Sequence, residues 1–117
     1  MKEKYRGIII RESLSNSSVL EGVKVFSEHT EPDQDNPNET WHIYTVEVSR
    51  DMIEELQSYL KRESGWYMHF WKGRDVIVVF RDKMFKINYD DKSTWKETID
   101  YGLLMGVPRE QLDFPID

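Results

Sequence analysis

Two stretches of the chain space their apolar residues at the 3.6-residue period of an amphipathic helix. The first covers residues 50–63 and follows Ser49, a residue type that caps helix N-termini. Its apolar positions are Met52, Ile53, Leu56, Tyr59 and Leu60. The second begins near Thr94, where Glu97 completes a capping-box pattern, and ends at Gly106. The spacing therefore predicts two helices.

Six other segments are rich in β-branched and aromatic residues and are bounded by Gly, Asp, Asn or Ser, which is typical of strands. They cover residues 5–14, 23–28, 41–48, 66–71, 75–80 and 84–89. Each block of three strands precedes one helix, and strands in direct succession favour antiparallel pairing. We expect a single α+β domain over residues 1–117: a two-layer sandwich in which a largely antiparallel sheet of about six strands carries two helices on one face.

Tight turns at residues 73–74 and 82–83 predict the register of the last three strands. They place Val78 opposite His69 on one side and opposite Ile87 on the other, on a face that we assign to the helix-covered core. The outer face then carries Trp66, Met68, Phe70, Ile77 and Val79, with Arg81 and Lys86 at its rim. Because an apolar face of this size is rarely left in water, it could be covered by the N-terminal strands or the tail, form a homodimer interface, or bind a ligand.

The composition indicates one small acidic domain. The 117 residues include 22 acidic and 16 basic ones, for a formal charge of −6, and no Cys. Without Cys, the chain has no disulfide, thiolate metal site or Cys nucleophile. The negative charge argues against broad binding to nucleic acid or to an anionic membrane, and no apolar run approaches the roughly 20 residues of a membrane span. We therefore expect a cytoplasmic protein with no membrane association.

The charge is unevenly distributed along the chain. Residues 28–40 hold five carboxylates, two Pro and no aliphatic residue, which predicts a solvated acidic loop. The spacing of these carboxylates does not match a Ca²⁺-binding loop, so we predict no metal site and no cofactor. Residues 61–86 carry a net charge of +4 among aromatic residues, the combination with which proteins bind single-stranded nucleic acid. Because the flanking segments are acidic, nucleic acid is the least favoured partner.

Several segments of the chain match a known pattern. They are GIIIRESL at 7–14, TVE at 45–47, WY at 66–67, FRDKMF at 80–85, and the YG, GVP and QLDF motifs between residues 101 and 114. Together they resemble a family of small uncharacterised archaeal and bacterial proteins. The family has no assigned activity, cofactor or catalytic residue, so the resemblance implies no function. Its pattern has Asp where His69 stands here, and His where Tyr44 stands.

Histidine is the first candidate for acid–base or metal chemistry, because its ordinary pKa lies near neutrality. His29 falls in the acidic segment, whereas His42 and His69 fall on predicted strands, where they could converge with carboxylates and Tyr44. No His-x-His or His-Glu-x-x-His spacing supports a metal site, and histidines with a structural role are the favoured interpretation. The weak catalytic or pocket candidates are His42, His69, Glu12 and Tyr44.

Three functions follow from these patterns, and a binding module is favoured over an enzyme. The first is an interaction protein that self-associates as a homodimer, or binds a protein partner, through the outer sheet face. The residues of this binding face are Trp66, Phe70, Ile77, Val79 and Arg81. The alternative is a small-molecule-binding or catalytic pocket that uses the His, Glu and Tyr candidates. Single-stranded nucleic-acid binding is the least favoured.

Overall fold

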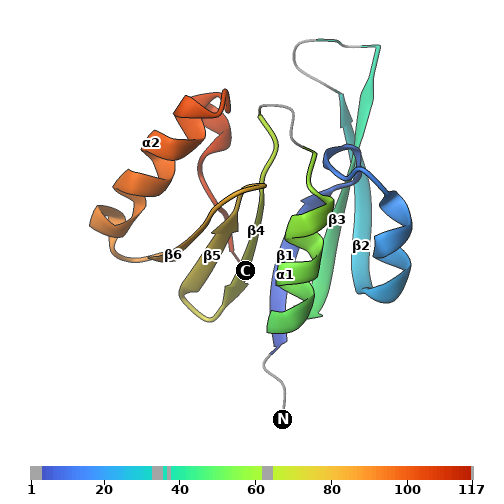
Figure 1. Ribbon diagram of the computed structural model, residues 1–117, viewed down its shortest axis with the longest axis horizontal. Coiled ribbons are helices and arrows are strands. Elements are labelled where there is room, and N and C mark those ends of the chain that lie inside the picture. The colour runs from blue at the N-terminus through green and yellow to red at the C-terminus, as the bar shows by residue number, and fades with distance from the viewer. Residues whose placement is uncertain (1–3, 33–35, 37, 62–64, 117) are drawn as a thin grey trace.

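The structure, a computed structural model, describes residues 4–32, 36, 38–61 and 65–116. Within these residues, six strands form one sheet (Figure 1): β1 (Lys4–Ile10), β2 (Lys24–Pro32), β3 (Thr40–Ser49), β4 (Met68–Lys72), β5 (Asp75–Val79) and β6 (Met84–Asn88). The α-helices are α1 (Arg50–Tyr59) and α2 (Lys96–Leu104). Short 3-10 helices are η1 (Arg11–Ser13), η2 (Ser17–Gly22), η3 (Lys92–Trp95) and η4 (Arg109–Gln111). The predicted α+β class is confirmed.

The strand order is β2-β3-β1-β4-β5-β6, and every neighbouring pair is antiparallel. Strand β1 therefore lies inside the sheet, between β3 and β4. The predicted register of β4 and β5 is confirmed, because His69 pairs with Val78. The register of β6 differs from the prediction by two residues, because Val78 pairs with Phe85 instead of Ile87. The turn lies at residues 81–82, one position earlier than predicted, where the Phe80 N–H donates to the Lys83 carbonyl (2.8 Å). A shift of two residues leaves every side chain on its predicted face.

Strand β2 is longer than the sequence predicts. The first residues of the acidic segment 28–40 do not form a loop but continue the strand, so that His29 pairs with Ile43 and Glu31 pairs with Trp41. Pairing with β3 satisfies the backbone N–H and C=O groups that point toward β3, while all side chains of this edge strand stay exposed. Residues 33–35 and 37 of that segment lie outside the described residues.

The two helices pack against alternate residues of the same strands. Helix α1 contributes Ile53 and Leu56 to a core that contains Phe70, Ile77 and Val79. The strand residues that alternate with these form a second core on the other face, together with α2 and its flanking segments. This second core includes Trp71, Val76, Val78, Trp95, Val107, Leu112 and Phe114. The two helices therefore cover opposite faces of these strands. The order of elements along the chain had favoured both helices on one face. In Figure 1, α1 lies in front of β1, and α2 lies at the left.

The predicted outer face is in fact a core. Phe70 and Val79 are fully buried and Ile77 is 3% exposed, because α1 packs over them. Trp66 packs against the edge of the same core, and Arg81 is partly exposed. The chain covers this face itself, with a helix and not with the N-terminal strands or the tail. The proposal of self-association through this face was therefore wrong.

Local contacts determine where α1 begins and ends. The Ser49 hydroxyl accepts a hydrogen bond from the Met52 N–H (3.3 Å), as its capping role predicts. The helix ends at Tyr59, earlier than predicted, because the chain then pairs with the segment after β1. There the Lys61 N–H donates to the Ser13 carbonyl (2.8 Å), and Leu60 forms an isolated bridge with Leu14. Residues 62–64, which the sequence analysis assigned in part to this helix, lie outside the described residues.

Gly7 allows β1 and β4 to pack closely, and this predicts a large effect of Gly7→Ala. A Cβ atom at this position would overlap Phe70 Cδ1, and it would lie 2.6 Å from Phe70 Cε1 and 3.0 Å from the His69 carbonyl oxygen. Because the Phe70 ring is fully buried, it has no free space to move into. We expect Gly7→Ala to lower the free energy of unfolding by about 1–3 kcal/mol, measured by urea denaturation.

The matched control is Gly22→Ala, because a Cβ atom there would lie 3.6 Å from Met52 Cε, an ordinary contact. This variant should unfold close to the wild-type midpoint. Equal midpoints for the two variants would show that the close approach at Gly7 does not restrict the fold.

Candidate functional site

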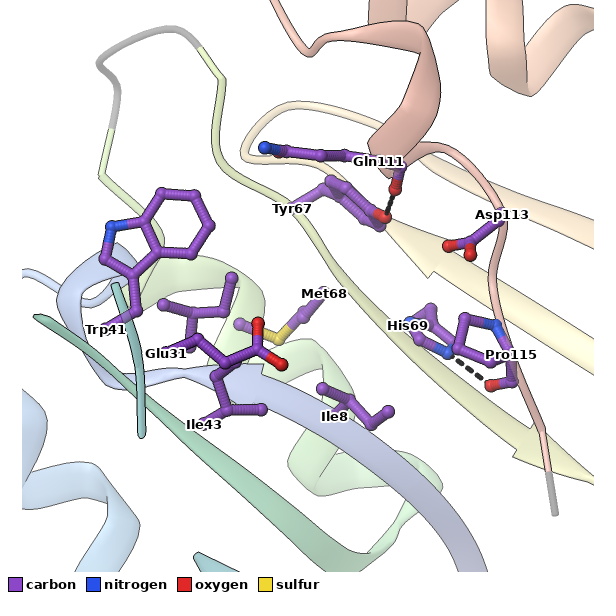
Figure 2. A pocket seen from close by; sticks show the side chains of 11 residues that line it. Ile8, Glu31, Trp41, Ile43, Tyr67, Met68, His69, Gln111, Asp113 and Pro115 are labelled. Atoms are coloured by element: carbon purple, nitrogen blue, oxygen red, sulfur yellow. Dashed lines mark hydrogen bonds between the residues drawn. The ribbon is translucent and has the colours of Figure 1, made fainter. Parts of the chain in front are cut away.

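A cavity of about 210 Å³ lies on the sheet face opposite α1 (Figure 2). Its floor is apolar: Ile8 and Ile10 come from β1, and Ile43 of β3 pairs directly with Ile10. Ile9, between the two β1 residues, points to the other face and is fully buried in the core under α1. Three consecutive isoleucines therefore serve two environments, a core on one face and a pocket floor on the other.

Aromatic and polar side chains form the walls of this pocket. One wall consists of Tyr67, which directly precedes β4, His69 of β4, and the chain after α2, which contributes Gln111, Asp113 and Pro115. The other wall consists of Trp41 from β3 and Glu31 from β2. In Figure 2, the Glu31 and Asp113 carboxylates lie on opposite sides of the pocket. The site thus combines an apolar floor, two aromatic rings and two carboxylates.

Specific contacts hold residues 111–115, which we call the C-terminal wall, in place. The Tyr67 hydroxyl donates to the Gln111 carbonyl, and His69 Nε2 donates to the Pro115 carbonyl at 2.7 Å. Between these two points, the fully buried Phe114 ring lies edge-on to Tyr67, with centroids 5.6 Å apart. Phe114 adopts a left-handed backbone conformation, with φ of 43°, which a residue with a Cβ atom rarely accepts. The wall therefore follows one defined path across β4.

His69 is a neutral group in this wall. It is 4% exposed, and its burial lowers the pKa from 6.5 to about 4, although the hydrogen bond to Pro115 and the negative charge of Asp113 act in the opposite direction. Because Nε2 must carry the proton that it donates to the carbonyl, Nδ1 carries the lone pair. His69 can accept a hydrogen bond, but it is a poor proton donor or acceptor for catalysis near pH 7.

Tyr67 is also neutral. Its pKa is raised, first by burial and then by the negative charge of Asp113, so the phenol keeps its proton. This proton is used in the bond to the Gln111 carbonyl. Tyr67 and His69 therefore both contribute fixed hydrogen bonds and not proton transfer.

The predicted catalytic set is divided between the two faces of the sheet. Glu12 accepts two hydrogen bonds from His42, one from the backbone N–H (2.7 Å) and one from ring Nδ1 (2.8 Å). This pair ties η1 to β3, and each side chain is about one third exposed (34% for His42 and 32% for Glu12). Tyr44 packs against the core under α1, whereas His69 lies on the opposite face, in the pocket. The four residues therefore do not form a single site.

Sequence reasoning found His69 by its residue type but missed most other residues of the pocket. The missed ones include Tyr67 and Asp113, which the fold brings together from positions far apart in the chain. The one local signal was the run Ile8-Ile9-Ile10, because a strand without polar alternation is apolar on both faces.

Comparisons with known proteins add no further assignment. No family model, curated protein or solved structure matches this chain. Among the described residues, no group of three or more His, Cys, Asp or Glu is arranged to hold a metal ion. No helix in the described part of the chain is long and apolar enough to cross a membrane.

The lowered pKa of His69 predicts a specific loss of stability in acid. As the pH falls, the unfolded chain takes up this proton near pH 6.5, whereas the folded protein takes it up only near pH 4. The contribution of His69 is therefore complete above pH 6.5 and is lost between pH 6.5 and 4. The unfolding free energy of the wild type should decrease over this range. We expect the decrease in His69→Gln, measured by urea denaturation, to be smaller by about 3 kcal/mol.

The control for this prediction is the same substitution at an exposed position, His29→Gln, whose side chain is 55% exposed on β2. The histidine NMR titration gives an independent measurement. A His69 resonance that titrates near pH 6.5 in the folded protein would contradict the buried, neutral state.

Proposed function

We propose that this protein binds a small organic molecule in the pocket formed by β1, β3, β4 and the C-terminal wall. The observation that carries this proposal is a cavity of about 210 Å³ that combines an apolar floor with hydrogen-bonding groups on its walls. Ligand sites in proteins are typically concave and mostly apolar, with a few polar groups that orient the ligand. The floor of Ile8, Ile10 and Ile43 and the walls around them have this composition.

The volume of the pocket limits the size of the ligand. An apolar cavity of about 150 Å³ accommodates benzene, so about 210 Å³ suits a single ring with one short substituent. Trp41 and Tyr67 offer flat surfaces on which such a ring can pack. Larger ligands would extend from the open side of the pocket into solvent.

The state of the polar groups supports binding over acid–base catalysis. Tyr67 and His69 each donate a hydrogen bond to a carbonyl of the C-terminal wall, and neither has a pKa near neutrality. A general acid or base works best with a pKa near the operating pH. The groups of this pocket are therefore suited to orient a ligand.

The positions of the other aromatic residues argue against single-stranded nucleic-acid binding. That function needs exposed rings on which bases can stack. Trp71, Phe80 and Phe85 of the basic segment 61–86 are all buried in the core under α2.

Benzyl alcohol, a neutral ligand of suitable size, provides a direct test. We expect it to shift the backbone NMR resonances of pocket residues in a saturable way, with the largest changes at β1, β4 and the C-terminal wall. Ile8→Trp should fill the floor of the pocket and abolish these shifts, because Ile8 is partly exposed inside it. A well-dispersed spectrum of the variant confirms that it is folded.

Leu104→Trp is the matched control, since Leu104 is 76% exposed on α2. It adds the same bulk outside the pocket and should bind benzyl alcohol as the wild type does. Scattered, non-saturable shifts, or full binding by Ile8→Trp, would refute the proposed site.

A further inference from the structure

We propose that the ligand of this pocket is a small organic ammonium ion, with an apolar body on the isoleucine floor and a positively charged nitrogen between Glu31 and Asp113. This inference rests on the proposed function and adds the chemical class of the ligand. The observation behind it is the sign of the charges that line the cavity.

The lining has a formal charge of −2. Glu31 and Asp113 are carboxylates from opposite walls, and the lining residues include no Lys or Arg. The other two titratable groups, Tyr67 and His69, are held neutral. A ligand with a positive charge therefore gains attraction from both walls, whereas an anion is repelled by both.

The uncharged groups of the walls also suit a cation. Trp41 and Tyr67 present aromatic rings, and the face of such a ring attracts an ammonium group. The Nδ1 lone pair of His69 can accept a hydrogen bond from an N–H group, because Nε2 is the atom that donates to Pro115. The walls thus combine aromatic faces with hydrogen-bond acceptors, which complement an ammonium ion.

One neighbouring group could weaken this charge. His29 Nε2 lies 3.5 Å from Glu31 Oε1 on the exposed strand β2. His29→Gln removes this group, so binding to that variant reports the carboxylates without this partial compensation.

The test compares three probes of nearly equal size: benzylammonium, benzyl alcohol and benzoate. At pH 8 and low salt, we expect benzylammonium to bind about tenfold more tightly than benzyl alcohol in NMR titrations, and benzoate to bind most weakly. The advantage of benzylammonium should shrink as salt is added, because ions screen charges at a partly open site.

Two substitutions identify the groups responsible. Asp113→Asn and Glu31→Gln should each lower the affinity for benzylammonium about fivefold and leave the affinity for benzyl alcohol unchanged. The matched controls are Asp100→Asn on α2 and Glu54→Gln on α1, whose side chains are 61% and 66% exposed and line no part of this pocket. These should bind both probes as the wild type does.

The outcomes separate this inference from the proposed function. Equal affinities for benzylammonium and benzyl alcohol would overturn the ammonium assignment and leave the pocket as a binding site for neutral ligands. Tighter binding of benzoate would also overturn it. No saturable binding of any probe would overturn the proposed function itself.

Discussion

Strand β4 is buried on both of its faces, with Phe70 under α1 and with His69 and Trp71 on the face of the C-terminal wall. A strand of this kind requires two separate covers, because each face exposes apolar surface that must leave water. Helix α1 covers one face across β1, β4 and β5. On the other face, α2 packs with β5 and β6, and the chain after it crosses β4.

The pocket lies where the second cover ends. The C-terminal wall passes over β4 through its bonds to Tyr67 and His69 and leaves Ile8 and Ile10 of β1 partly exposed beside it. The fold requires a separate layer of chain over each face of the sheet. At the edge of the C-terminal wall, this arrangement leaves a concave apolar surface.

The sequence predicted the elements of this fold better than their arrangement. Alternation assigned Phe70, Ile77 and Val79 to one face and Val76 and Val78 to the other, and the structure keeps that division. The alternation pattern could not show that α1 covers the first face, because both faces are apolar and neither has the polar composition of a solvent-exposed face. The extension of β2 was missed for the opposite reason: an exposed edge strand such as residues 28–32 has the composition of a loop.

The site was less predictable than the fold. His69 was a candidate because of its chemistry, but its partner Pro115 is 46 positions away along the chain, and Tyr67 bonds to Gln111 across 44 positions. No spacing rule covers contacts of this kind, which depend on the path of the final segment over the sheet. His42 and Glu12, the other candidates, do meet, but on the face of α1, where they join η1 to β3.

The backbone of Phe114 makes the path of the C-terminal wall depend on the packing of one buried ring. A left-handed conformation is disfavoured for any residue with a Cβ atom, and a following proline restricts the residue further, so this geometry costs roughly 1–3 kcal/mol. Burial of the ring beside Tyr67 and Trp95 compensates for this cost only while the ring stays in place. The strained backbone and the neighbouring hydrogen bonds to the Gln111 and Pro115 carbonyls therefore depend on the packing of the same ring.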